Sequence, residues 1–251
     1  MRRRMPKANP RTADAIIARH GIARVISKLG MGSRTQAARW VNEGRIRVNG
    51  ELVRDSEFPV LQGVDCISID GLDTTAQTRL VIMLNKPRGL VTTTNDDRGR
   101  ETVYRCLANS ELPWLAPVGR LDKASEGLLL FSNDPTWAAR ITDPTSGPAK
   151  TYHVQVNRLP DAGRCAELER GVMVDGEHLS AKTVRCLRAG DRNAWLEIVL
   201  EEGRNRQIRR LMTAFDMSVL RLMRIAIGPL LLGSLPKGQW RRLTEQEMES
   251  L

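Results

Sequence analysis

The sequence predicts an α+β protein made of a small unit and a larger one. Residues 22–71 show the pattern of two short helices followed by a hairpin, whereas residues 80–251 mix alternating apolar runs, typical of strands, with capped helices. Residues 72–79, rich in threonine, are interpreted as a short linker. With 251 residues, of which 41% are hydrophobic, the chain is long enough and apolar enough to bury a full core.

The chain carries a large excess of positive charge, with 39 Lys and Arg against 29 Asp and Glu and a net charge of +10. This balance favours a polyanionic partner, either nucleic acid or, as the rival, an anionic membrane surface. Residues 1–21 are interpreted as a basic N-terminal arm, which either adds affinity for the partner or only keeps the protein soluble. No apolar stretch is long enough to span a bilayer and no signal-type segment follows the basic start, so we expect a cytoplasmic protein.

The small unit has clear local signals. Residues 23–29 predict a helix, and Ser33 with Gln36 three residues later forms a capping box that starts a second one. Asn49-Gly50 joins two short alternating runs, which predicts a hairpin with a two-residue turn. The unit is therefore expected to be two helices packed on a small antiparallel sheet.

This arrangement resembles the S4-type RNA-binding domain. The signature residues of that family fall here at Arg24, Ser33, Arg34, Ala37, Gly44, Arg45, Val48, Asn49 and Gly50. In the family the two helices present basic side chains to folded RNA, so the resemblance implies phosphate contacts from Arg24, Lys28, Arg34, Arg39 and Arg45. For each residue alone the alternative is a solvated helical face, but the set favours RNA binding.

The larger unit is organised around residues 119–134, GRLDKASEGLLLFSND. Its apolar run 128–131 predicts a buried strand, and Asp134 followed by Pro135 predicts the capped start of a helix. Asp122 therefore lies at the mouth of a core strand.

The charges around Asp122 favour its ionised form, because Arg120 and Lys123 are its near neighbours in the sequence. An ionised carboxylate at such a position can attack an electrophile or hold a cation. The alternative is a surface ion pair that follows a turn.

A second motif, EEGRNRQIRRLM, covers residues 201–212. Gly203 ends a predicted strand over 194–201, and a helix is predicted over 207–215. Four arginines in this motif would repel one another unless an anion or a carboxylate neutralises them: Arg204, Arg206, Arg209 and Arg210. Glycine and arginine at a strand-to-helix junction favour a phosphate, and the alternative is a basic helix that faces solvent.

Other segments complete the larger unit. A buried strand over 81–84 leads into a turn with Lys86 and Arg88, and KTYHVQV, residues 150–156, predicts a strand with Tyr152 on its inner face. An inward tyrosine is more often a core residue than a catalytic one. Four widely spaced cysteines form no Cys-x-x-Cys pair, so neither a zinc site nor a disulfide framework is predicted.

These two motifs, together with LNKPRGLVTT, KTY and the GxxxLxxLPxGxxRxLTxxE ending that starts at Gly228, resemble the RsuA-type family of ribosomal RNA pseudouridine synthases. The resemblance implies an α+β fold: a mixed, mostly antiparallel sheet carrying helices, a cleft across its middle, and the small RNA-binding domain on a tether. It implies isomerisation of uridine to pseudouridine without metal or organic cofactor, on ribosomal RNA or a pre-ribosomal particle, by a monomer.

The resemblance also assigns roles to individual residues. Asp122 matches the catalytic aspartate, which attacks C1′, adds to C6 or removes a sugar proton; the sequence leaves these three chemistries open. Tyr152 matches the tyrosine that stacks on the target base, and Arg209 matches the basic partner of the aspartate. Substrate contacts are expected from Arg120, Lys86, Ile208, Arg204 and Arg206.

Two alternative functions belong to other classes. The same modules suit a noncatalytic rRNA-binding protein of ribosome assembly. A metal-dependent nuclease that uses Asp122, Glu126 and Asp134 fits poorly, because these carboxylates lie on both sides of an apolar strand and among arginines.

Overall fold

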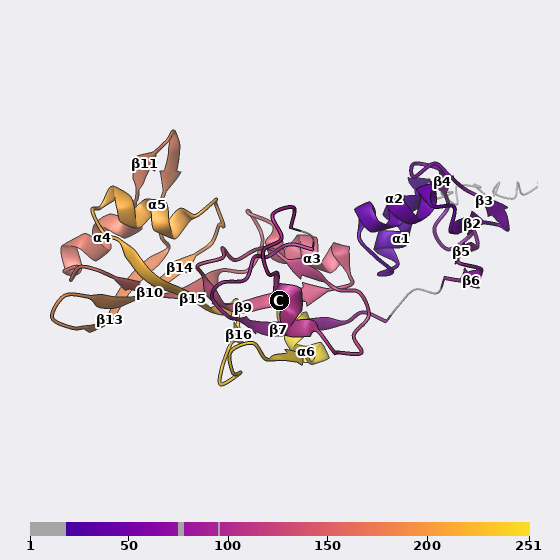
Figure 1. Ribbon diagram of the computed structural model, residues 1–251. Helices are drawn as coiled ribbons and strands as arrows, with labels where there is room; N and C mark the ends of the chain where they lie inside the picture. The colour runs from indigo at the N-terminus through magenta and orange to yellow at the C-terminus, as the bar shows by residue number, and fades with distance from the viewer. Residues whose placement is uncertain (1–18, 75–77, 95) are drawn as a thin grey trace, which may run out of the picture. The chain divides into compact units, whose positions relative to one another are not determined.

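The computed structural model describes residues 19–74, 78–94 and 96–251 (Figure 1). Its backbone contacts separate two compact units, one formed by 19–26 and 34–74 and the other by 27–33 and 78–251. Most of the basic arm expected over residues 1–21 lies outside the described residues. None of the helices in the described part of the chain has the length and apolar character needed to span a bilayer.

The small unit contains the two helices and the hairpin that the sequence predicts. Its elements are β1 (His20–Gly21), α1 (Ile22–Lys28), α2 (Arg34–Asn42), β2 (Ile46–Val48), β3 (Glu51–Leu52), β4 (Pro59–Val60), β5 (Ile67–Ile69) and β6 (Leu72–Asp73). The main sheet has the order β3-β2-β5-β6, and β1 pairs with β4. Asn49 and Gly50 have φ angles of 51° and 84°, the left-handed pair that a tight hairpin turn requires.

The sheet of the small unit extends further than predicted. β6 pairs with β5 and takes up the first two residues of the segment expected to be a linker over 72–79. Residues 75–77 of that segment lie outside the described residues.

The larger unit is a nine-stranded sheet with helices on its faces. Its first half contains β7 (Val81–Lys86), the 3-10 helix η1 (Val103–Leu107), β8 (Ala116–Val118), β9 (Glu126–Ser132), α3 (Pro135–Thr142) and β10 (Lys150–Val156). Then come α4 (Ala162–Arg170), β11 (Val172–Val174), β12 (Glu177–Leu179), β13 (Thr183–Ala189), β14 (Ala194–Leu200) and α5 (Gln207–Ala214). The last elements are β15 (Val219–Ile227), β16 (Leu230–Leu231), β17 (Trp240–Arg242) and α6 (Glu245–Glu249).

The sheet has the order β13-β14-β10-β15-β9-β7-β17, with β16 beside β15 and β8 beside β9. Every pair is antiparallel except β9 with β15, which is parallel, so the expected mixed, mostly antiparallel sheet is confirmed. β11 and β12 form a separate hairpin. Figure 1 shows α4 and α5 together on one side of β10, β13 and β14.

Side-chain alternation explains which faces are covered. β10 and β14 alternate between buried and half-buried residues, because one face packs on the core under α4 and α5. β7 and β9 are buried at every position. Their two faces contribute to two different apolar clusters, one shared with η1 and one that includes residues of α3 and α6.

The two halves of the sheet meet where β9 pairs with β15 over only two register positions, Met223 with Glu126 and Arg224 with Gly127. Gly127 has a φ angle of 100°, and a Cβ atom there would overlap the backbone of Arg224, so only glycine allows this approach. Arg224 Nε donates to the carbonyl oxygen of Leu128 at 2.7 Å.

A buried carboxylate completes this junction. The side chain of Glu126 is 3% exposed and accepts hydrogen bonds from Arg221 Nε of β15 at 2.9 Å and from Lys237 Nζ at 2.5 Å. These two cations hold the pKa of the Glu126 carboxyl below its usual value although burial opposes the shift. Glu126 therefore ties the strand that follows Asp122 to the opposite half of the sheet.

Candidate active site

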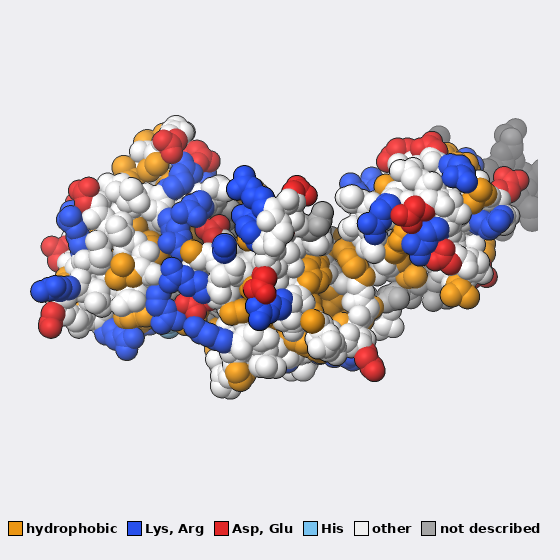
Figure 2. All heavy atoms as spheres, in the orientation of Figure 1, with side chains coloured by type: hydrophobic (Ala, Val, Ile, Leu, Met, Phe, Trp, Pro, Cys, Tyr) orange, Lys and Arg blue, Asp and Glu red, His pale blue; other side chains and the backbone are white. Residues whose placement is uncertain are grey.

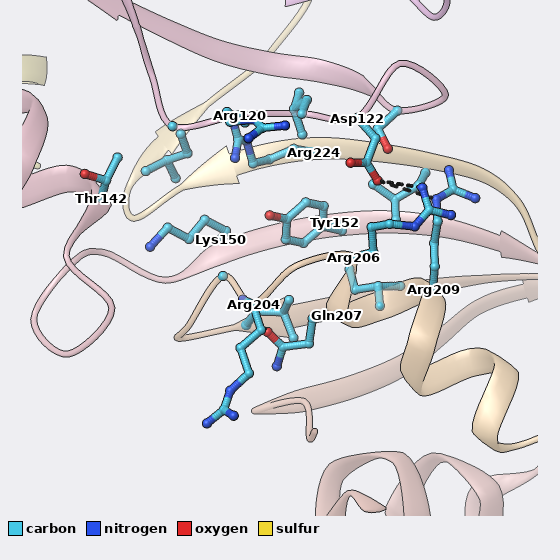
Figure 3. Close-up of a pocket in the computed structure, with 18 of the residues that line it drawn as sticks. Arg120, Asp122, Thr142, Lys150, Tyr152, Arg204, Arg206, Gln207, Arg209 and Arg224 are labelled. Carbon is cyan, nitrogen blue, oxygen red and sulfur yellow. Dashed lines mark hydrogen bonds and ion pairs between the residues drawn. The ribbon is translucent and has the colours of Figure 1, made fainter. Parts of the chain in front are cut away.

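A cleft of about 230 Å³ lies in the larger unit, between the turn that carries Asp122 and the start of α5. It brings together seven residues singled out from the sequence: Arg120, Asp122, Tyr152, Arg204, Arg206, Ile208 and Arg209 (Figure 3). Lysines and arginines gather in a band over this part of the larger unit (Figure 2). In the cleft itself six cationic residues line the wall with one carboxylate, that of Asp122.

Asp122 faces two arginines of the second motif. Its Oδ2 atom lies 3.4 Å from Arg206 Nη1 and 3.9 Å from Arg209 Nε. The side chain of Asp122 is 38% exposed, which leaves the carboxylate open to the cleft. Arg206 and Arg209, at the start of α5, therefore lie beside Asp122 although they are far from it in the sequence. Arg206 comes nearer to the carboxylate than Arg209, which is the partner implied by the family resemblance.

Arg209 also donates a hydrogen bond to the turn that carries Asp122. It is half-buried, and its terminal nitrogens donate to the carbonyl oxygens of Ala124 and Val219, both at 3.4 Å. Burial, with the neighbouring charge of Arg206, lowers the pKa of Arg209. Two crowded guanidinium groups beside one carboxylate leave surplus positive charge, which suits an anionic ligand.

Arg206 holds a strained backbone conformation at the N-cap of α5, with a φ angle of 48°. A non-glycine residue in this left-handed region costs about 1 to 2 kcal/mol. Gln207, 3% exposed, secures the loop, because it accepts from the backbone N–H of Arg204 at 3.1 Å and donates to Glu202 at 2.9 Å. Gln207 was not among the site residues predicted from the sequence.

Tyr152 lies between the two ends of the cleft. It is 9% exposed and belongs to β10, where its direct neighbours across the sheet are Ile198 of β14 and Arg224 of β15. Figure 3 shows its ring between Lys150 on one side and Asp122 with Arg206 on the other. Tyr152 therefore contributes an aromatic ring to the lining of the cleft, near the carboxylate.

Lys86 does not contact this cleft, so the expected substrate contact is wrong. Its side chain is fully buried and its ammonium donates to the carbonyl oxygens of Pro87, Asp122 and Ser125 at 3.1, 3.2 and 2.8 Å. Burial lowers the pKa of Lys86 to about 8. Lys86 instead supports the Asp122 turn from inside the protein.

The basic residues of the small unit differ in availability. Arg24, Arg34 and Arg39 are exposed, whereas Lys28, at the end of α1, is half-buried and belongs by its backbone contacts to the larger unit. Arg45 donates to Asp70 through Nε at 2.9 Å and through Nη2 at 2.5 Å. Its guanidinium also lies 5.5 Å from the ring centre of Trp40, so Arg45 is engaged within the small unit and is the least available of the five for a phosphate.

The three carboxylates of the nuclease alternative do not form one site. Glu126 is buried between two cations, whereas Asp134 caps α3 by accepting from the backbone N–H groups of Thr136 and Trp137. Within residues 19–74, 78–94 and 96–251, no group of three or more His, Cys, Asp or Glu side chains is placed to hold a metal ion.

Two basic residues of the cleft, Lys150 and Arg224, were not predicted as site residues. Their signal is the period of two along the strands. Lys150 lies two residues before Tyr152 on the same face, and Arg224 lies two residues after the buried Leu222. A charged residue on a core-facing position is the pattern that identifies them.

Comparison with known proteins gives the same picture for both units. The family model described as RNA pseudouridylate synthase matches residues 80–214, and the S4 domain model matches residues 21–66. An uncharacterised RNA pseudouridine synthase from Aquifex aeolicus is 35% identical over 92% of this chain and 92% of its own length. The ribosomal large subunit pseudouridine synthase B of Bacillus subtilis is 33% identical over 92% of this chain and 94% of its own. A crystal structure of a pseudouridylate synthase superimposes with a TM-score of 0.64 and 30% identity, covering 92% of this chain and 99% of that one.

Proposed function

The chain belongs to the RNA pseudouridylate synthase family, and we propose that it isomerises a specific uridine of ribosomal RNA to pseudouridine. The observation that carries the proposal is the position of Asp122: a partly exposed carboxylate within 4 Å of two arginines, in a cleft that a tyrosine ring also lines, inside the matched family domain. Relatives named for the large ribosomal subunit support large-subunit rRNA as the substrate.

The reaction is redox-neutral and uses no co-reactant. The bond between N1 of uracil and C1′ breaks, the base turns, a bond forms between C5 and C1′, and the proton of C5 is lost while N1 gains one. Asp122 supplies the carboxylate that starts the cleavage. The Asp122 turn is supported by Lys86 and Arg209, so its carboxylate is already in position when the nucleotide enters.

The target base has to leave its stack before it can reach this cleft, at a cost of a few kcal/mol. Tyr152 offers the stacking surface that offsets part of this cost, since base–aromatic stacking contributes about 1 to 3 kcal/mol. Tyr152 is also the side chain that assists the later transfer of the C5 proton in this proposal. Arg120, exposed at the rim, fills the vacated stack or holds a phosphate.

The two units divide the work in this proposal. The segment that matches the S4 domain model, residues 21–66, supplies affinity through Arg24, Lys28, Arg34 and Arg39, and the larger unit performs the chemistry. The protein acts as a monomer in the cytoplasm, on rRNA or on a pre-ribosomal particle.

The proposal is tested by incubating the purified protein with unmodified large- and small-subunit rRNA transcripts and mapping pseudouridines chemically. We expect one modified position, in the large-subunit transcript. Tight binding of rRNA without any new pseudouridine, in either transcript or in assembly intermediates, would support the noncatalytic assembly protein instead.

A further inference from the structure

The end of the cleft away from Asp122 carries positive charge without a matching carboxylate. Lys150 and Arg224 line it, and Arg120 lies above them (Figure 3). Among the described residues that line the cleft, Asp122 is the one acid, and it faces Arg206 and Arg209 at the other end. The second group of cations therefore needs a different anion.

Arg224 has an unsatisfied donor at this end. The residue is 5% exposed, and its Nε atom is fixed on the carbonyl oxygen of Leu128. Its buried Nη2 atom has no hydrogen-bond partner among the described residues. A buried guanidinium nitrogen without an acceptor costs on the order of a lost charged hydrogen bond, so Arg224, which lines the cleft, would gain from an acceptor that reaches Nη2 when the ligand binds.

Lys150 reinforces the charge of Arg224. It is half-buried on the neighbouring strand β10, and burial together with the charge of Arg224 lowers its pKa. Asp143, the nearby acid that opposes this shift, is occupied locally, because its Oδ1 accepts from Thr145 and Ser146. Among the described residues no ion pair within 4 Å joins Asp143 to Lys150 or to Arg224, so Asp143 acts on Lys150 only from a distance.

We propose that Lys150 and Arg224 form a binding subsite for one phosphodiester group of the RNA, next to the target uridine. This inference rests on the proposed function. A phosphate fits better than a base carbonyl, because a neutral acceptor does not offset two desolvated cations. The position fits as well, because Arg224 is the direct neighbour of Tyr152 across the strands, with a Cα–Cα separation of about 5 Å. It is therefore close to the ribose phosphate of a nucleotide whose base stacks on that ring.

The test uses equilibrium binding by Asp122→Asn protein, so that no turnover interferes. The probes are large-subunit rRNA fragments that contain the mapped uridine, each with a single uncharged methylphosphonate at one phosphate around it. The added substitutions are Lys150→Ala, Lys150→Arg and, as a matched control, Lys182→Ala. Lys182 is an exposed lysine outside the cleft that pairs with Glu201.

We expect one methylphosphonate flanking the target to weaken binding roughly 10- to 100-fold. Lys150→Ala should weaken binding to a similar extent and reduce the slope of log K against log salt concentration by about one. In this variant the same methylphosphonate should have almost no further effect on affinity. Lys150→Arg should restore most of the affinity, and Lys182→Ala should behave like the parent. Equal unfolding midpoints of Lys150→Ala and the parent would exclude a folding defect.

Additive losses from Lys150→Ala and from every methylphosphonate, or unchanged binding by Lys150→Ala, would overturn the subsite. Failure of the proposed function has a separate signature, because the active protein would then produce no pseudouridine in the unsubstituted fragment. Failure of the subsite alone leaves the mapped uridine and its modification in place and removes only the coupling between Lys150 and the methylphosphonate.

Discussion

Replacing Glu126 by glutamine tests whether the buried carboxylate at the sheet junction positions the active site. The change keeps the size of the side chain but removes the charge that two cations share. The carboxylate is 3% exposed, whereas its partners Arg221 and Lys237 are 40% and 54% exposed. Breaking a fully buried ion pair costs about 3 to 5 kcal/mol, and water can solvate these two partners, so we expect a smaller loss of about 2 kcal/mol.

For a unit of this size, that loss corresponds to a fall in the unfolding midpoint of about 4 to 8 °C. Glu126 joins the strand that follows Asp122 to β15, which neighbours the strand of Tyr152, so the side chains of Asp122 and Tyr152 should also shift apart. Displacement by about 1 Å costs up to roughly 100-fold in rate. We therefore expect the saturated single-turnover rate to fall at least tenfold with little change in half-saturating RNA concentration.

Thermal unfolding followed by circular dichroism and single-turnover kinetics measure the two effects. Glu201→Gln, which removes an exposed partner of Lys182, serves as the control and should cost less than about 0.5 kcal/mol. The double variant Glu126→Gln, Lys237→Gln should lose less free energy of unfolding than the sum of the two single variants. Each single change removes one member of the ion pair and leaves the charge or polar group of the other without its partner. A Glu126→Gln protein with the stability and rate of the parent would refute the positioning role.

Three further predictions concern other parts of the molecule. Burial lowers the pKa of Lys86 from its ordinary 10.5 to about 8. Between these two pH values the folded protein binds fewer protons than the unfolded chain, so its stability rises with pH. Over the same range the neutral amine of Lys86 has one N–H fewer to donate to the carbonyl oxygens of the Asp122 turn. The single-turnover rate should therefore decline above about pH 8 in the parent but not around that pH in Lys86→Met, and identical alkaline profiles would contradict this. Arg206→Gly should raise the free energy of unfolding by about 1 kcal/mol by relieving the left-handed strain, yet lower the rate; a drop in stability on urea titration would show that the strain argument is wrong. Arg34→Ala should weaken rRNA binding and reduce its salt slope, whereas Arg45→Ala, which releases Asp70, should mainly destabilise the small unit; equal effects on binding would contradict the distinction.

Local signals in the sequence predicted much of the fold. The capped start of α3 at Asp134 and the Asn49-Gly50 turn both depend on backbone preferences within a few residues, and the structure confirms both. The alternation of β10 and β14 likewise predicted their strands, since one face of each packs on the core.

Elements without such signals were missed. α4 buries only Leu168 and carries a largely polar sequence, so it has no broad apolar stripe to read. β13 is an edge strand in which only Val184 is buried, and alternation is absent for that reason. Both depend on tertiary packing against the sheet.

The sequence brought Asp122 and the arginine motif to attention, but not the contacts between them. Which guanidinium comes nearer to the carboxylate depends on the left-handed turn at Arg206, which no residue preference indicates. Lys86 was misassigned because lysines are rarely buried. Its burial depends on three carbonyl oxygens that converge only after folding.

The most direct test of the central claim measures release of the uridine C5 hydrogen. Large-subunit rRNA transcripts labelled with tritium at C5 of uridine should lose one tritium per target site to water, because forming the bond between C5 and C1′ expels that atom. We expect stoichiometric release by the parent and none by Asp122→Asn, which should still bind the transcript with parental affinity. Release by Asp122→Asn at the parental rate, or no release by the parent, would contradict the claim that Asp122 drives pseudouridine formation.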